Sequence, residues 1–552
     1  MHPPEASPTI DRREALFVFV ISALVAVVMT WPLAINLGDI VAENDVGDPL
    51  LQAWELAWGG HALTTDIGSL WDGNAFWPLD DGLAFSDALT GYAPLAVFGS
   101  GTGAAIIRYN LLFLFGYSLA GLGAYLLARE LKVGAGPAAI AGAVYAWAPW
   151  RLTHNAHLNI ISSGGIPLSL FLLVRGYRRD DKRLIVGGWV VATWQVSLGF
   201  NLGLSFGYLL AGVCLWILVG RLRAKRLLAD KGAILATAVG LTLFLGWTAW
   251  QAMPYLRVVE EHPESRRQEG EVHFYSPPAL GFITAPAQSK LWGGLTEERR
   301  ATLNWPSEQS LWPGGIAIVL GAVGLTFSGF TLRFRIALFV AILVAGVVAM
   351  GFRFGDGVVY RYIYDYLPGW QGLRTPGRLI NLITLGLALL AAGGATALLS
   401  GSSRMLRGRK QLAAGLLVAV LVLVEGVGTI VYWEVPDAAP VMASAETPQL
   451  HLPSDWLVDP TYMFLSIDGW PQIANGHSGF IPTQVAEMRA QTVNFPDEAS
   501  IAYLREKGVR SVVFHRSLAP GTPWADVEAR PIGSGIVTQD LGSVLVYDIS
   551  PE

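Results

Sequence analysis

The chain has 552 residues, of which 52% are hydrophobic and only 15% are charged. Soluble globular proteins carry about 25% charged residues, so this composition excludes an ordinary soluble protein and favours an integral membrane protein. The formal net charge of −5 argues against a nucleic-acid partner. The single cysteine, Cys214, excludes a disulfide within the chain and a metal site built from thiolates.

Apolar stretches long enough to cross a bilayer recur along the chain. A transmembrane helix needs about 20 mostly apolar residues. The first stretch follows Arg12 and Arg13 and lacks a small-residue cleavage site, which favours a retained span over a signal peptide. We expect an α-helical polytopic membrane protein with about eleven transmembrane helices, at 13–35, 105–128, 134–150, 158–175, 184–200, 202–220, 231–251, 312–330, 335–351, 378–400 and 411–432.

The distribution of Lys and Arg predicts which side each loop faces, because short cytoplasmic loops carry an excess of both. The loop at 175–183 (RGYRRDDKR) is strongly basic, whereas no Lys or Arg lies between Arg13 and Arg108. Within that interval, residues 36–104 contain ten Asp or Glu residues. We therefore expect a cytoplasmic N-terminus and, with an odd number of spans, an extracytoplasmic C-terminus.

This topology predicts two domains. Residues 1–432 form the transmembrane domain, whose first external loop, 36–104, contains interfacial helices. Residues 433–552 form a small external α/β domain, long enough for one modest core. Within the first loop, residues 88–101 (ALTGYAPLAVFGSG) are rich in Gly and Pro, which favours an interfacial or re-entrant segment over a further span.

The external tail has its own local signals. Residues 497–507 (DEASIAYLREK) have a helical pattern that Gly508 ends. The runs at 510–514 (RSVVF) and 543–548 (SVLVYD) are typical of strands. The tail also contains aromatic residues near turn-forming residues, and two interpretations stay open: a sugar-stacking surface or a small core. The residues concerned are Trp456, Trp470, Phe480, Asn475, His477 and Ser478.

A helix start is predicted early in the first external loop. Asp48 precedes Pro49, and an Asp cap followed by Pro is a common beginning of a helix. In the helix that follows, Trp54, Trp58 and His61 share one face, which we expect to lie in the outer membrane interface. Asp48 would then either cap this helix, carry chemistry, or do both.

The chain resembles a known family of membrane enzymes. One span, a long external loop with an early Asp, many further spans and an external C-terminal domain together resemble the GT-C superfamily of polyprenyl-phosphate-sugar-dependent glycosyltransferases. The resemblance is to a bacterial branch related to the YfhO-type membrane proteins. The segments that carry it are GDPLLQAWELAW (47–58), RLTHNAHL (151–158), LPGWQGLRTPGR (367–378) and NGHSGFIP (475–482).

The resemblance implies site residues. The early loop Asp of GT-C enzymes is the usual catalytic base or acceptor-orienting group, and this role falls on Asp48, with Asp45 as second choice. A departing phosphate needs positive charge, which Arg supplies through its planar fork. We therefore expect substrate binding by arginines at the outer boundaries, with membrane anchoring as the other interpretation; these are Arg151, Arg374 and Arg378.

Three further polar residues are candidates for substrate binding. His154 and His157 follow Arg151 at a spacing that puts them on one helix face, so metal ligation and hydrogen bonding to phosphate or acceptor both stay open. A divalent metal is therefore an open expectation for a cofactor. Glu308 is a candidate second carboxylate, or a polar residue at a helix entrance.

The expected function is transfer of a sugar from a polyprenyl-phosphate carrier to a glycan, lipid or protein acceptor of the cell envelope, in a bacterial plasma membrane. The alternatives are a transporter or flippase of a lipid-linked or polar substrate, and a non-catalytic assembly protein. Glu425 lies in an apolar span, where ionisable residues are often functional, and favours the transporter. Arg108 is a candidate partner for it.

Overall fold

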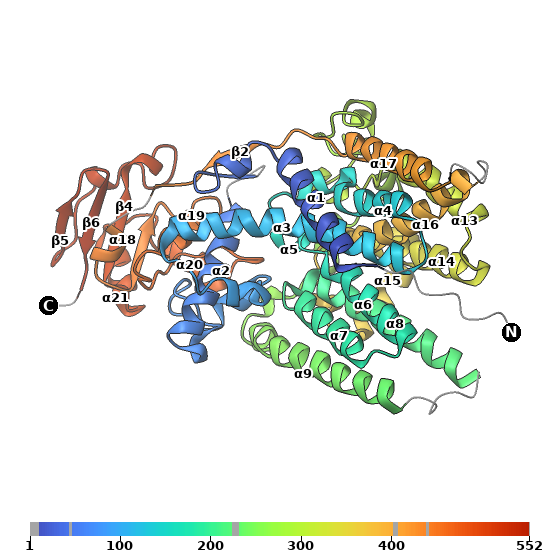
Figure 1. Ribbon diagram of the computed structural model, residues 1–552. Coiled ribbons are helices and arrows are strands. Elements are labelled where there is room, and N and C mark those ends of the chain that lie inside the picture. Colours follow the sequence, from blue (N-terminus) through green and yellow to red (C-terminus); the bar gives the residue numbers. More distant parts are fainter. Residues whose placement is uncertain (1–9, 43–46, 224–230, 401–406, 438–440, 551–552) are drawn as a thin grey trace. The chain divides into compact units, whose positions relative to one another are not determined.

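The computed structural model describes residues 10–42, 47–223, 231–400, 407–437 and 441–550, and the chain divides into two compact units (Figure 1). The helical unit consists of Met1–Ile35, Leu112–Trp250 and Arg267–Val431. The loop–tail unit consists of Asn36–Leu111, Gln251–Arg266 and Tyr432–Glu552. The loop after α1 and the tail thus belong to one unit, although more than 300 residues separate them in sequence.

Each of the eleven predicted spans overlaps a helix. These helices are α1 (Arg12–Met29), α3 (Gly101–Glu130), α4 (Ala135–Trp147), α6 (Gly165–Arg179), α7 (Lys182–Val196), α8 (Phe200–Arg223), α9 (Lys231–Glu261), α13 (Gly315–Phe327), α14 (Leu332–Ala349), α16 (Ile380–Ser400) and α17 (Arg407–Glu425). Within the described residues, six helical stretches are long and apolar enough to span a membrane: 101–130, 158–179, 200–220, 231–261, 332–349 and 376–399. The chain is therefore a membrane protein, and the number of eleven spans stays a prediction.

Small residues let several of these helices approach closely. α13 packs against α16, and α4 packs against both α16 and α17 (Figure 1). A methyl group added at Gly324 of α13 would overlap the Leu390 carbonyl oxygen of α16, and one at Gly415 of α17 would overlap the backbone of Gly136 in α4. Such contacts are typical of membrane helices, whose association depends on close packing because lipid gives little hydrophobic drive.

Glu425 ends α17 and caps a neighbouring helix. Its side chain is 2% exposed. Its Oε1 accepts hydrogen bonds from Trp292 Nε1 at 2.9 Å and from the Gly315 amide, and its Oε2 accepts one from the Ile316 amide at 3.2 Å. Gly315 and Ile316 begin α13, where unpaired amides and the helix dipole favour a negative charge. The buried charge is therefore satisfied within the fold.

Replacing Glu425 by Ala is expected to lower the free energy of unfolding by about 1–3 kcal/mol, because buried donors lose their acceptor. Glu425→Gln keeps one acceptor oxygen and should cost about 1 kcal/mol. Thermal unfolding of the purified chain in detergent measures both changes. Glu298, an exposed residue of the same unit, supplies the control Glu298→Ala. Equal melting temperatures for Glu425→Ala and the control would contradict the capping role.

Arg108, considered as a partner of Glu425, has other contacts. Its Nη2 donates to the carbonyl oxygens of Phe98 at 2.6 Å and Gly99 at 3.1 Å, within the loop–tail unit. The segment it holds carries exposed apolar side chains, with Phe98 75% exposed. The interfacial or re-entrant character of residues 88–101 stays a prediction.

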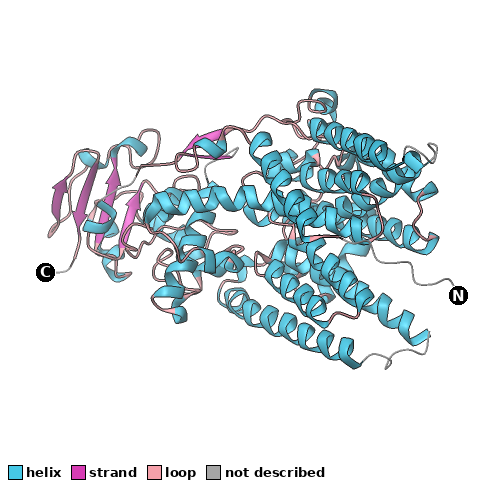
Figure 2. Ribbon diagram, in the orientation of Figure 1, coloured by secondary structure: helices cyan, strands magenta, loops and turns pink. Residues whose placement is uncertain are grey.

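The tail contains a four-stranded sheet of order β3-β4-β6-β5 (Figure 2). The strands are β3 (Gln449–Leu452), β4 (Ser511–His515), β5 (Val537–Asp540) and β6 (Val544–Asp548). β3 is parallel to β4, and the other two pairs are antiparallel. A second, two-stranded sheet joins β1 (Ile40–Ala42) of the first loop to β2 (Tyr432–Glu434).

The local predictions for the tail are confirmed. α21 covers Glu498–Glu506, with Asp497 as its N-cap, and Gly508 has the positive φ of 78° that suits a residue after a helix. β4 and β6 match the two predicted strands. The remaining helices of the chain are α2 (Gly47–Thr64), α5 (Leu158–Ile161), α10 (Glu269–Tyr275), α11 (Glu297–Arg300), α12 (Pro306–Gln309), α15 (Val358–Tyr366), α18 (Val441–Ser444), α19 (Asp459–Leu465) and α20 (Thr483–Gln491).

The predicted interfacial face of α2 is wrong, because protein covers this helix. Trp54 is 1% and Trp58 is 7% exposed. Their indole N–H groups donate to Asn74 Oδ1 at 2.9 Å and to the Leu70 carbonyl oxygen at 3.0 Å. The repeating tryptophans are typical of a membrane-surface helix, but here they form the core between α2, α19 and the loop that follows α2.

The end of α9 holds the first loop in place. Arg257 makes a two-bonded ion pair with Asp81, at 2.6 and 2.7 Å. Tyr255 donates its hydroxyl to the Ser86 carbonyl oxygen at 2.9 Å, and Gln251 donates to Thr90 Oγ1 at 3.1 Å. These contacts fix the loop around residue 87, close to α2.

Candidate active site

Asp48 lies in the first turn of α2, at the N-terminus of a buried helix. Because α2 begins at Gly47, Asp48 is one position inside the helix and not at the predicted cap position; an Asp in the first turn still interacts favourably with the helix dipole. Its side chain is 34% exposed, and its Oδ1 lies 3.9 Å from His477 Nε2. The second candidate, Asp45, lies outside the described residues.

His477 is held in a defined orientation. Its Nδ1 is 2.9 Å from the Trp456 carbonyl oxygen, which can only accept, so Nδ1 carries a proton. The Trp456 ring lies 4.1 Å from the imidazole, between centroids. Nε2 therefore faces Asp48, and a second proton on the ring would give an ion pair with this carboxylate.

The backbone around His477 is fixed by a buried network. Asn475 donates to Asp459 Oδ1 at 3.0 Å and to the His451 carbonyl oxygen at 2.9 Å. Asp459, which is fully buried, also pairs with Arg489 at 2.8 Å. The predicted aromatic and polar cluster of the tail is thus partly structural, since Asn475 builds this turn.

Two other tail aromatics also contact the first loop. Trp470 stacks on His61 at 4.6 Å between ring centroids, and Phe480 lies 5.3 Å from Phe85. Ser478 donates to the carbonyl oxygen of Phe480. These aromatic side chains join the two parts of the loop–tail unit, which accounts for them without a sugar, and sugar binding stays a prediction.

Sequence reasoning missed Glu55, which lies two turns after Asp48 on the same face of α2. It is 2% exposed, and its Oε2 has no hydrogen-bond partner among the described residues. Burial raises the pKa of Glu55 well above its ordinary value, and the charges of Asp87 and Asp48 raise it further. The available signal was an acidic residue in the middle of a mostly apolar helical run.

The helical unit brings together five of the predicted residues. Arg378 and Glu308 form a buried ion pair, with Nη2–Oε1 at 2.5 Å and Nε–Oε2 at 3.2 Å. His154 is 1% exposed, and its ring lies 5.4 Å from that of His157. Burial lowers the pKa of His154 to about 3, so the ring is neutral at physiological pH, although the nearby charge of Glu308 opposes this effect.

Arg151 is the fifth residue of this group, and its donors are occupied. Its Nε donates to the Tyr145 carbonyl oxygen at 2.9 Å, and its Nη2 donates to Ser163 Oγ at 2.5 Å and to Asn381 Oδ1 at 3.2 Å. Its guanidinium also lies 5.1 Å from the Trp150 ring. These contacts favour a structural role, and phosphate binding by Arg151 stays a prediction.

Among the described residues, the guanidinium of Arg374 has fewer hydrogen bonds than those of Arg151 and Arg378. It is half-buried and lies 4.9 Å from the centroid of the Tyr275 ring. Within the described part of the chain it makes no ion pair. A second cation, Arg267, lies close enough for the charge of Arg374 to lower its pKa, after the larger effect of burial. Phosphate binding by Arg374 stays a prediction.

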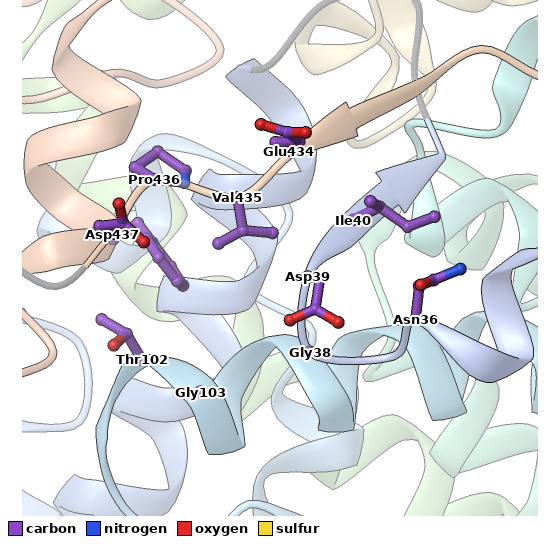
Figure 3. A pocket seen from close by; sticks show the side chains of 11 residues that line it. Asn36, Gly38, Asp39, Ile40, Thr102, Gly103, Glu434, Val435, Pro436 and Asp437 are labelled. Carbon is purple, nitrogen blue, oxygen red and sulfur yellow. The ribbon is translucent and has the colours of Figure 1, made fainter.

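A metal site is not supported by the described residues, which contain no group of three or more His, Cys, Asp or Glu side chains arranged to hold an ion. One cavity of about 460 Å³ lies in the loop–tail unit. Figure 3 shows the carboxylates of Asp39, Glu434 and Asp437 around it. None of the predicted site residues lines this cavity.

The comparison with known proteins rests on structure. No protein-family model and no curated protein matches the sequence. A mutant form of arabinofuranosyltransferase AftD from Mycobacteria has 16% sequence identity and a TM-score of 0.57, over 99% of this chain. The chain spans only 42% of the length of that protein.

Two other solved structures are less similar. The oligosaccharyltransferase AglB from Archaeoglobus fulgidus, solved with an inhibitory peptide and a dolichol-phosphate, has 14% identity over 97% of this chain and 74% of its own, with a TM-score of 0.45. ArnT from Cupriavidus metallidurans has 14% identity over 97% of this chain and 98% of its own, with a TM-score of 0.43. The likeness that carries an argument is therefore that to AftD, and it shows that the chain shares the fold of the matched part of this arabinofuranosyltransferase.

Proposed function

We propose that the chain transfers a sugar from a polyprenyl-phosphate carrier to an acceptor of the cell envelope. The observation that carries the proposal is the Asp48–His477 pair at the start of α2, in a chain with the GT-C fold. The Asp48 carboxylate is one-third exposed and a fixed histidine faces it, whereas Asp81 and Asp459 are paired with arginines and Glu55 is buried.

The chemistry assigns one role to each group. Asp48 accepts the proton of the acceptor hydroxyl as this oxygen attacks the sugar carbon. The bond from that carbon to the carrier phosphate breaks, and the phosphate leaves with the bonding electrons. The charge on the phosphate oxygens increases in the transition state, so positive charge beside them favours the reaction.

The proposal includes the orientation expected from the charges. The acidic first loop and the tail face the extracytoplasmic side of a bacterial plasma membrane, and the basic short loops face the cytoplasm. The partners are then a polyprenyl-phosphate-linked sugar, the bilayer that holds it, and a glycan, lipid or protein acceptor.

The transporter alternative is less well supported than sugar transfer. Its main sequence argument was a buried ionisable residue in an apolar span, Glu425. That side chain accepts hydrogen bonds from the start of α13 and from Trp292, so a structural role accounts for it. No other described contact favours transport.

Sealed proteoliposomes distinguish the two functions. Purified chain is reconstituted with lipid-linked sugars extracted from bacterial membranes, together with envelope glycan as acceptor. The proposal predicts that sugar appears on the acceptor while free polyprenyl phosphate accumulates, both detected by mass spectrometry. Movement of intact lipid-linked sugar between leaflets, without cleavage of its sugar–phosphate bond, would instead show a flippase.

His477→Gln is expected to lower the transfer rate by about 10- to 100-fold, because loss of the fixed imidazole lets the Asp48 carboxylate move, and small displacements of a reacting group have effects of this size. The rate is measured at saturating lipid-linked donor. His273, an exposed histidine in α10, supplies the matched control His273→Gln. A rate equal to that of the control would remove His477 from the mechanism.

A further inference from the structure

Glu55 is buried in α2 without an ion-pair partner. α2 is buried along nearly its whole length, and Glu55 is 2% exposed in its centre. Within the described residues no Lys, Arg or His forms an ion pair with it, and its Oε2 accepts no hydrogen bond. Glutamates are almost never buried in this way unless a cation pairs with them.

The surroundings of Glu55 are acidic. Asp87, from the loop that Tyr255 holds, and Asp48 both act on it electrostatically. Two cations of the unit have other partners, Arg257 with Asp81 and Arg489 with Asp459. The titratable groups on elements packed against α2 are Tyr92, Asp459 and Tyr462. Tyr255 also interacts electrostatically with Glu55, and His477 lies 3.9 Å from Asp48.

An unpaired carboxylate in such a place is costly, so the group keeps its proton instead. A neutral Glu55 leaves Asp48 and Asp87 as the local negative charges. An ionised Glu55 would add a third, and repulsion between them would oppose binding of an anionic phosphate donor.

We propose that Glu55 is a protonated positioning residue for Asp48. While Glu55 is uncharged, Asp48 can be ionised in a site that receives a phosphate-bearing substrate. When Glu55 loses its proton at alkaline pH, its negative charge weakens binding of that substrate. The link to substrate rests on the proposed function. The protonation of Glu55 does not, and it is tested without any transfer assay.

The first test is the pH dependence of stability in the full-length chain in detergent. Burial raises the pKa of Glu55, so between about pH 4.5 and this raised pKa the folded chain holds a proton that the unfolded chain has lost. The contribution of Glu55 to stability is therefore fully present below about pH 4.5 and is lost as pH rises. Glu55→Gln has no such proton, so its folding equilibrium constant relative to wild type should increase about tenfold per pH unit in this window.

The matched control is Glu487→Gln, an exposed glutamate of α20 in the same unit. Its stability relative to wild type should not change over this pH range. A constant ratio between Glu55→Gln and wild type from pH 5 to pH 9 would overturn the proposal, because Glu55 would then be ionised in the folded chain.

The second test needs no stable variant. Infrared spectra of wild-type chain labelled with carbon-13 in its glutamate side chains should show a carboxylic-acid C=O band at pH 7 that disappears on alkaline titration. Absence of that band at pH 7 would also overturn the proposal. The band should persist in Asp48→Asn. If that variant still transfers sugar, the proposed function is rejected, but the conclusion that Glu55 is protonated still holds.

The effect of Glu55 on substrate binding is measured separately, through KM. If Asp48 is catalytic, KM for the lipid-linked donor should increase more in wild type than in Glu55→Gln over the pH range in which the infrared band disappears. An equal increase in both, with Asp48→Asn inactive, would reject the positioning role of Glu55 while leaving the proposed function in place.

Discussion

Replacing Asp48 by Asn is expected to lower sugar transfer by about 100- to 10,000-fold, the usual contribution of a general base. Asn has nearly the same size as Asp but accepts no proton. If Asp48 served only the helix dipole of α2, the same change would lower stability by about 0.3–1 kcal/mol and would leave the transfer rate nearly unchanged. The two roles therefore predict results that differ by orders of magnitude. The measurement is transfer from a lipid-linked donor at equal protein abundance.

Two further variants serve as a control and as a test of the second candidate. Asp66 is an exposed acid of the same loop whose Oδ1 accepts a hydrogen bond from the Gly68 amide at 2.9 Å, so Asp66→Asn controls for loss of a negative capping side chain. It should keep the wild-type rate. Asp45→Asn tests the second candidate of the sequence. Full activity of both Asp45→Asn and Asp48→Asn would show that the proposed mechanism is wrong.

Replacing Arg378 by Ala is expected to lower the free energy of unfolding by about 3–5 kcal/mol, since it leaves the Glu308 carboxylate buried without its partner. Both side chains are less than one-tenth exposed, and two hydrogen bonds join them. The double variant Glu308→Leu with Arg378→Met removes both charges and should cost much less, because replacing a whole buried pair with apolar side chains is often nearly neutral. Thermal unfolding in detergent measures both variants. Equal losses for the single and double variants would contradict a buried pair.

The same pair predicts a pH dependence. Burial alone would raise the pKa of Glu308, but the charge of Arg378 and its hydrogen bonds lower it well below the ordinary value of 4.5. A depressed pKa in the folded state means that the stabilisation is present above about pH 4.5 and is lost as pH falls. Wild-type chain should therefore lose stability on acidification more steeply than the double variant.

Sequence patterns predicted the elements that local chemistry determines. Each apolar range became a helix, and in the tail Asp497 and Gly508 mark the two ends of α21 as capping preferences require. The fold was expected from a resemblance to GT-C enzymes, and the chain shares the fold of the arabinofuranosyltransferase AftD. These features depend on residues near one another in the chain, so a single sequence contains their signal.

Tertiary contacts determined the rest. The tryptophans of α2 suggested a membrane surface, but the first loop and tail bury them. Arg378 and Glu308 were separate candidates, and only the fold brings together residues 70 positions apart. Glu55 was missed because its importance lies in what surrounds it, namely two acidic side chains and, among the described residues, no cation paired with it. Neither the Arg378–Glu308 pair nor the surroundings of Glu55 has a sequence pattern that predicts it.

The central claim is that Asp48 serves cleavage of a sugar–phosphate bond. The most direct test incubates purified wild-type chain and Asp48→Asn with lipid-linked sugars and envelope glycan as acceptor, and quantifies free polyprenyl phosphate and sugar transferred to the glycan together. The account predicts equal amounts of the two products from wild type and at least about 100-fold less of both from Asp48→Asn. Equal product formation by the two proteins, or intact lipid-linked sugar after incubation with folded wild type, would contradict it.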